Sequence, residues 1–159
     1  MIDPKEFRIG NYLLLSDNLL RVSEIAVGHI CVNGVYRPTD NPQFPIEYNP
    51  ISFDDPNLHP FWLTDNVFRM ITNVIPTSHG SAYRFSRSAT YLIYPDGEGD
   101  YFVGLDNKGE LQRVTPTAFN TLHALQNIYY AMYGDEMPTE EGNLINALWY
   151  SRNNNGQNQ

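Results

Sequence analysis

Three short apolar runs separated by two turn sequences make residues 91–114 the strongest constraint on the fold. The runs read YLIY, YFVGL and ELQRV, and the turns between them read PDGEGD and DNKG. Glycine supplies the left-handed backbone of tight hairpins, so both turns favour antiparallel strand pairs. A further candidate strand covers 82–86. The sequence therefore predicts an antiparallel β-meander over 82–114.

A long helix is predicted directly after the meander, over residues 116–133. Thr115 can cap it, Pro116 suits its first turn and Gly134 can end it. Apolar side chains recur at spacings of three and four residues, at Ala118, Leu122, Leu125, Tyr129 and Met132. We expect this stripe to cover the β-rich body and close a single core.

The opposite side of this helix is polar but uncharged. Its polar stripe consists of His123, Gln126, Asn127 and Tyr130. Two interpretations stay open. The side chains could bond to neighbouring backbone atoms, where the meander packs, or face water. Alternatively they could form a contact surface for a protein partner, or for a second copy of the chain, because uncharged polar and tyrosine side chains suit such surfaces. A second candidate surface consists of the strand tyrosines Tyr83, Tyr91, Tyr94 and Tyr101.

The first part of the chain, residues 7–53, is predicted to form a small antiparallel β unit. Short apolar runs cover 11–15, 19–26 and 29–32. Such short strands favour either a curled sheet or an SH3-like barrel. Asn33–Gly34 is a typical two-residue hairpin signal, so a turn is expected there.

Prolines mark the connection between the two β units. They recur between residues 37 and 60, and since proline removes a donor from a strand ladder, at most one strand is expected in this connector. A short helix is predicted over 60–71, because Pro60 suits a first helical turn.

The expected architecture is α+β. Residues 1–137 should form one compact domain, since a chain of 159 residues can bury a core without staples. Residues 138–152 are expected to add a short terminal helix as an appendage, and 153–159 to form a disordered tail.

Charge and hydropathy narrow the classes of function. The chain has 10 Lys and Arg against 18 Asp and Glu, a net charge of −8. Its cations are scattered, which disfavours direct binding to nucleic acid or to an anionic membrane. An acidic surface could instead imitate DNA, so a nucleic-acid-associated role remains an alternative. No apolar run has the length of a membrane span or a signal-peptide core, so a cytoplasmic protein is expected.

Local motifs for catalysis, metals or cofactors are missing from the sequence. Cys31 is single and lies in an apolar run, so neither a disulfide nor a thiolate zinc site is expected. The alternating acids of 96–100 resemble half of a calcium loop, but Tyr101 and Asn107 occupy the positions of its glycine and glutamate. A hydrolase assembled from distant residues is the least favoured alternative. We expect a non-enzymatic module that binds a protein partner and needs no cofactor.

Three motifs occur together in the chain. They are Arg8-Ile9-Gly10-Asn11, then Asn49-Pro50-Ile51-Ser52-Phe53, and the run LHALQNIYYAMYGDE over 122–136. Together they resemble a family of small proteins encoded by Bacteroidetes bacteria and by their phages and mobile elements, over about residues 7–137. The chain departs from that pattern at Tyr133, in its longer proline-rich connector and in its last helix. The resemblance implies a phage or mobile-element context, and it carries over no catalytic residue.

Overall fold

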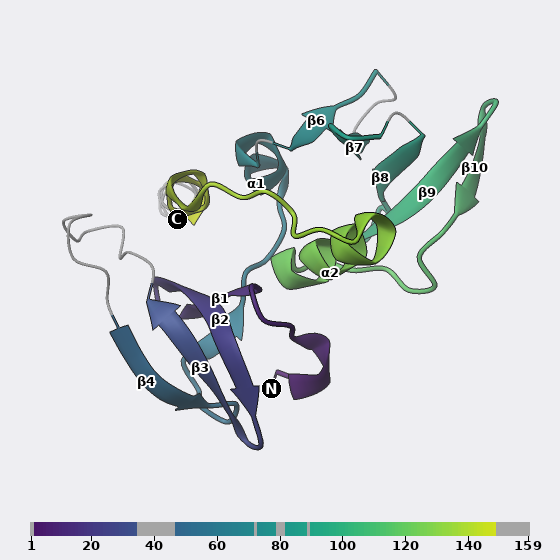
Figure 1. The fold of residues 1–159 in the computed structure, drawn as a ribbon. Coiled ribbons are helices and arrows are strands. Elements are labelled where there is room, and N and C mark those ends of the chain that lie inside the picture. The colour runs from purple at the N-terminus through teal and green to yellow at the C-terminus, as the bar shows by residue number, and fades with distance from the viewer. Residues whose placement is uncertain (1, 35–46, 72, 79–81, 89, 149–159) are drawn as a thin grey trace.

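Two antiparallel five-stranded sheets dominate the computed structural model, which describes residues 2–34, 47–71, 73–78, 82–88 and 90–148 (Figure 1). The two sheets follow one another along the chain, and α-helices pack against them. Neither sheet closes on itself, so the N-terminal β unit is a curled sheet and not a barrel. The predicted α+β class is confirmed.

The first sheet has the strand order β4-β3-β2-β1-β5. A short 3₁₀ helix, η1 (Pro4–Glu6), precedes it, and its strands are β1 (Tyr12–Leu15), β2 (Asn18–Ala26), β3 (His29–Gly34), β4 (Glu47–Ser52) and β5 (Leu58–Pro60). The predicted turn at Asn33–Gly34 is wrong, because β3 continues through both residues. The long strand β2 supplies pairing partners for them, Arg21 opposite Asn33 and Leu20 opposite Gly34.

The second sheet has the strand order β10-β9-β8-β7-β6. Its strands are β6 (Val74–Pro76), β7 (Tyr83–Phe85), β8 (Tyr91–Pro95), β9 (Tyr101–Asn107) and β10 (Glu110–Arg113). The predicted meander is confirmed, and β6 extends it by a strand that the sequence analysis did not predict. Gly97, Gly99 and Gly109 all have positive φ in the two turns, as the turn sequences indicated.

The first helix is shorter than predicted. It was expected over 60–71, but α1 spans Asp65–Met70. Thr64 caps it, since its side chain accepts a hydrogen bond from the Val67 amide. Pro60 instead ends β5, where it pairs with Leu13. Proline can stand there because β5 is an edge strand.

The long helix also begins later than predicted. It was expected over 116–133 with Thr115 as its cap, but α2 spans Leu122–Tyr133 with Thr121 as its cap. The Thr115 hydroxyl accepts a hydrogen bond from the Val103 amide at 3.1 Å, so it serves the second sheet instead. The predicted end is correct, because Gly134 closes α2 in the left-handed conformation.

Buried apolar side chains form two clusters. The larger lies among α1, α2 and the second sheet, and the smaller lies under the first sheet with Ile2 and Phe7. Strand β1 joins them, because Tyr12 and Leu14 belong to the larger cluster and Leu13 to the smaller. Strand β2 also contributes to both, with Leu19 in the larger cluster and Leu20 in the smaller, so two strands that are buried on both faces tie the two sheets together.

The last helical stretch, residues 141–148, belongs to the same core. Leu144 and Ala147 are buried in the larger cluster, so this stretch is no mere appendage. Residues 149–152 and the predicted tail 153–159 lie outside the described residues. None of the helices in the described part of the chain has the length and hydropathy of a membrane span.

Candidate functional site

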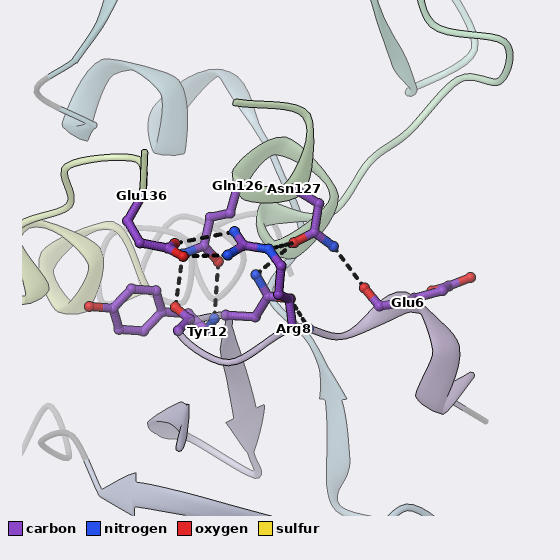
Figure 2. A network of polar contacts seen from close by, with 8 residues as sticks. Glu6, Arg8, Tyr12, Gln126, Asn127 and Glu136 are labelled. Atoms are coloured by element: carbon purple, nitrogen blue, oxygen red, sulfur yellow. Dashed lines mark hydrogen bonds and ion pairs between the residues drawn. The ribbon is translucent and has the colours of Figure 1, made fainter. Parts of the chain in front are cut away.

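The polar stripe of α2 faces residues 6–12, here called the N-terminal segment (Figure 2). His123 is 2% exposed and Gln126 is 1% exposed, whereas Tyr130 is 42% exposed. The stripe was expected to bond to neighbouring backbone, to face water or to meet a partner. Burial excludes His123 and Gln126 from an outward contact surface, and the segment that covers them is the N-terminal one instead of the meander.

Gln126 binds the backbone of the N-terminal segment as a neighbouring strand would. Its Oε1 atom accepts a hydrogen bond from the Tyr12 amide at 3.0 Å, and its Nε2 atom donates one to the Gly10 carbonyl at 3.1 Å. These backbone groups are buried and would otherwise lack partners at the start of β1. A single side chain thereby satisfies two buried polar groups 114 to 116 residues away in sequence.

Asn127 extends this contact. Its Oδ1 atom accepts hydrogen bonds from the Asn11 side chain at 3.0 Å and from Arg8 Nε at 3.2 Å, and its Nδ2 atom donates to the Glu6 carbonyl at 2.8 Å. The Arg8 guanidinium also pairs with both oxygens of Glu136 (Figure 2). The Arg8 guanidinium also lies 4.0 Å from the centre of the Tyr130 ring and forms a cation–π contact with it. Tyr130 is the last residue of the polar stripe.

Two of the motifs that carry the family resemblance therefore contact each other. The Arg8–Asn11 motif binds the 122–136 motif through Gln126, Asn127 and Glu136. Gly10 has a φ of +93°, and a β-carbon at that position would lie 3.4 Å from the Glu136 carboxylate. The physical role of both motifs is to dock α2 onto the first sheet. No local pattern reveals this pairing, because the partners are more than a hundred residues apart.

His123 has a different environment. Its ring lies 4.3 Å from the Phe7 ring, and its Nε2 atom is 3.5 Å from a Glu6 carboxylate oxygen and 3.3 Å from the Thr121 hydroxyl. Burial lowers the pKa of His123, and the nearby Glu6 only partly opposes that shift. Among the described residues, the Nδ1 atom has no hydrogen-bond partner. Both neighbours contact the same ring nitrogen, so the three side chains do not form a nucleophile–base–acid relay.

The four candidate tyrosines do not form one surface. Tyr83 and Tyr101 are buried in the larger cluster, where their rings pack on Phe68 at 4.6 and 4.7 Å. Burial raises the pKa of Tyr101 to about 12, with a further contribution from the Asp65 carboxylate. Tyr91 is half-buried at the edge of that cluster. Only Tyr94 lies on the opposite face of the sheet, because side chains alternate along each strand.

That opposite face, here called the outer face, is partly aromatic. It comprises the side chains that alternate away from the core, namely Ile75, Arg84, Leu92, Tyr94, Phe102, Asp106, Leu111 and Arg113. Tyr94 and Phe102 are direct cross-strand neighbours with nearly parallel rings 5.7 Å apart. The Arg113 guanidinium lies 5.3 Å from the centre of the Phe102 ring. None of these eight residues belongs to either buried cluster.

Leucine side chains complete the outer face. Leu111 is 41% exposed and lies across Gly104, where a β-carbon would be 2.5 Å from its Cδ1 atom. The glycine in β9 thus makes room for Leu111 beside the aromatic pair. Leu92 is only 3% exposed, although it belongs to neither buried cluster. The outer face therefore combines apolar and aromatic side chains with two arginines.

Two cavities adjoin each other where the N-terminal segment meets α2. Their volumes are about 440 and 480 Å³, and they share Glu6, Asn120, Thr121 and His123 as lining residues. Lys5 lines only the first cavity, and Trp62 lines only the second. The Glu6 side chain, which lines both cavities, points away from Arg8, Asn127 and Glu136 (Figure 2).

Within the described residues, no cluster of His, Cys, Asp and Glu side chains could hold a metal ion. The acids of 96–100 serve the β8–β9 turn, where the Asp96 carboxylate accepts hydrogen bonds from the amides of Glu98 and Asp100. This arrangement is a capped turn, as expected from its flanking strands. Comparison with known proteins yields no similarity, since no family model, no curated protein and no solved structure matches the chain.

Proposed function

We propose that this protein is a non-enzymatic module that binds a protein partner through the outer face of its second sheet. The observation that carries this proposal is the stacked Tyr94–Phe102 pair with Arg113 beside it, on a face outside both buried clusters. Aromatic residues and arginine are enriched in the centres of protein interfaces, where lysine and acidic residues are depleted.

The composition of the outer face fits such a centre. Apart from Asp106, its charged residues are Arg84 and Arg113, although the whole chain has a net charge of −8. Both arginines are held in place: Arg113 Nε donates to the Thr115 carbonyl at 3.0 Å, and Arg84 donates to the Phe85 carbonyl. Side chains that are ordered before binding lose less conformational entropy when a partner docks.

The biological context is also a proposal. The likeness of the 8–11 and 122–136 motifs to proteins of Bacteroidetes phages and mobile elements supports an accessory role in such an element, within the host cytoplasm. The network around Arg8 and Asn127 accounts for these motifs as elements of the fold. The partner-binding residues are accordingly sought elsewhere, on the outer face.

The test compares three tagged proteins in affinity capture from the native host: the wild type, Phe102→Thr and the control Glu110→Thr. Glu110 is an exposed strand residue on the other face of the same sheet. We expect both the wild type and the control to recover the same partner, and Phe102→Thr to recover at least about tenfold less. Equal recovery by all three proteins, with unfolding curves that overlap, would contradict the proposal.

A second candidate is the binding of single-stranded nucleic acid on the same face. Stacked aromatic rings beside arginine are the groups on which bases stack, although the net charge of −8 opposes association with phosphates. An electrophoretic shift of a single-stranded oligonucleotide at low salt separates the two candidates. A shift that fades with added salt and is lost in Phe102→Thr supports nucleic acid as the ligand, and no shift supports a protein.

A further inference from the structure

The second cavity, of about 480 Å³, has the features of a binding site that is separate from the outer face. It lies between the N-terminal segment, the stretch around β5 and the start of α2. Its lining combines aromatic and polar side chains, including Glu6, Phe7, Trp62, Asn120, Thr121 and His123. Sites for small ligands and for single side chains commonly combine apolar walls with a few convergent polar groups.

The charge of this lining is negative. Glu6 contributes a carboxylate, and none of the described lining residues is Lys or Arg. Asp54 and Asp55 directly precede the lining residue Pro56 in sequence and add negative charge at that end. The one nearby lysine, Lys5, lines the neighbouring cavity instead. A cation in the second cavity would therefore be attracted, and an anion would be repelled.

Trp62 provides an aromatic wall for this cavity, and its ring is not buried in the core. Its side chain is 52% exposed, although its backbone is fixed by an isolated β-bridge to Thr121. Tryptophan is the best aromatic partner for a cation, and a desolvated ammonium or guanidinium group gains most from such a contact. The exposed ring and the one carboxylate of the lining border the same cavity, a combination suited to a cation.

His123 lines both cavities. Because Nε2 lies 3.5 Å from the Glu6 carboxylate, the neutral ring is best placed with its proton on Nε2. The Nδ1 atom is buried and has no hydrogen-bond partner among the described residues. The ring therefore contributes to the wall of the cavity and helps to position the Glu6 carboxylate.

We propose that the second cavity binds a guanidinium or ammonium group, with Glu6 as its counter-ion and Trp62 as its aromatic wall. A guanidinium group suits the site best because it is planar, weakly hydrated and carries five N–H donors. The group could belong to a free organic cation or to an arginine side chain of a partner protein. The second source rests on the proposed protein-binding function, and the first does not.

The test measures binding of Nα-acetyl-L-arginine amide and of its neutral isostere Nα-acetyl-L-citrulline amide, by calorimetry and by the shift of the Trp62 indole N–H signal in NMR spectra. We expect saturable binding of arginine amide and at least tenfold weaker binding of citrulline amide, roughly the contribution of a charge-assisted hydrogen bond. The tripeptide Gly-Arg-Gly distinguishes the sources, since tighter binding of the tripeptide indicates a peptide partner. Equal binding of arginine and citrulline amides, or no saturation, would overturn the proposal.

Two variants locate the site and one serves as a control. Glu6→Gln keeps the shape of the side chain and removes its charge, and Trp62→Leu removes the aromatic wall. Both side chains are mainly exposed, so both variants are expected to fold. Each should weaken binding of arginine amide at least about fivefold, whereas Glu98→Gln, in the distant β8–β9 turn, should leave it unchanged. Unchanged binding in Glu6→Gln would refute the assignment.

The outer-face variant keeps this test independent of the proposed function. Phe102→Thr changes the second sheet far from the cavity and should bind arginine amide as the wild type does. If Phe102→Thr loses the captured partner but keeps arginine binding, the two sites are separate. If arginine binding fails while partner capture depends on Phe102, the cavity assignment falls and the proposed function stands.

Discussion

The polar stripe of α2 is covered by the N-terminal segment, whereas the outer face of the second sheet lies outside both buried clusters. The first region is rich in amides and is used for folding. The second is rich in apolar and aromatic groups, and most of its side chains are half-buried or exposed. The difference shows that residue type alone does not decide which surface is free. Buried backbone amides and carbonyls need hydrogen-bond partners, so the polar side chains near them are used for folding.

The two faces of the second sheet give the same comparison within one element. Phe85 is fully buried against Tyr129, with ring centres 5.3 Å apart, while Phe102 is half-buried beside Tyr94. Both are strand phenylalanines with tyrosine neighbours. Phe85 lies on the face of the sheet that α1 and α2 cover, whereas Phe102 lies on the opposite face.

The largest expected effect separates these two phenylalanines. Phe85→Ala should lower the free energy of unfolding by about 3–5 kcal/mol, since it leaves a cavity in the larger cluster. Phe102→Ala should lower it by roughly 1 kcal/mol, because its ring is already partly in water. Urea denaturation of both variants measures the difference. Equal losses would show that the outer face is part of the core.

The next effect tests whether the polar stripe serves the fold. Gln126→Ala should lower the free energy of unfolding by about 2–4 kcal/mol, because it leaves the buried Tyr12 amide and Gly10 carbonyl without this hydrogen-bond partner. The matched control is Gln112→Ala on the exposed strand β10, which should stay within about 0.5 kcal/mol of the wild type. Thermal or urea unfolding compares them, and a Gln126 variant as stable as the control would count against the docking role of this side chain.

The smallest expected effect is a pH dependence centred on His123. Burial lowers its pKa in the folded protein below the value of 6.5 for the free side chain. The unfolded chain therefore binds the proton more readily, so this group contributes its full stability above about pH 6.5, and the contribution is lost as the pH falls below that value. The Glu6 carboxylate, 3.5 Å from the Nε2 atom of the ring, opposes the shift only in part.

The measurement compares unfolding free energies at pH 7.5 and pH 5.5. His123→Gln should lose less stability over that interval than the wild type does. His29→Gln, a change in the first sheet, should show the wild-type difference. A wild type and a His123→Gln variant with identical pH dependence would show that the buried ring does not titrate in this range.

Sequence patterns identified most of the elements that are held by local interactions. The turns of the meander were predictable because glycine positions with positive φ are a local requirement. The end of α2 at Gly134 was predictable for the same reason. The start of α2 was not predictable, because both Thr115 and Thr121 could cap a helix. Only the tertiary structure distinguishes them: Thr115 accepts a hydrogen bond from the Val103 amide, and Thr121 caps α2.

The candidate site was less accessible to sequence reasoning. The stripe of α2 was identified correctly as a row of polar side chains, but its partners at Gly10 and Tyr12 are more than a hundred residues distant. The cavity beside Glu6 and Trp62 joins segments that no spacing rule connects. The strand tyrosines were grouped by type, and the period of two along each strand then divided them between opposite faces.

By itself the sequence determined the class of fold, the meander and the acidic, cation-poor character of the chain, because these depend on backbone preference and composition. The tertiary structure alone decided which polar groups are consumed by folding and which aromatic groups remain free. The physical reason is that a buried amide or carbonyl must find a partner wherever the chain brings one close, and that choice is made in space and not along the sequence.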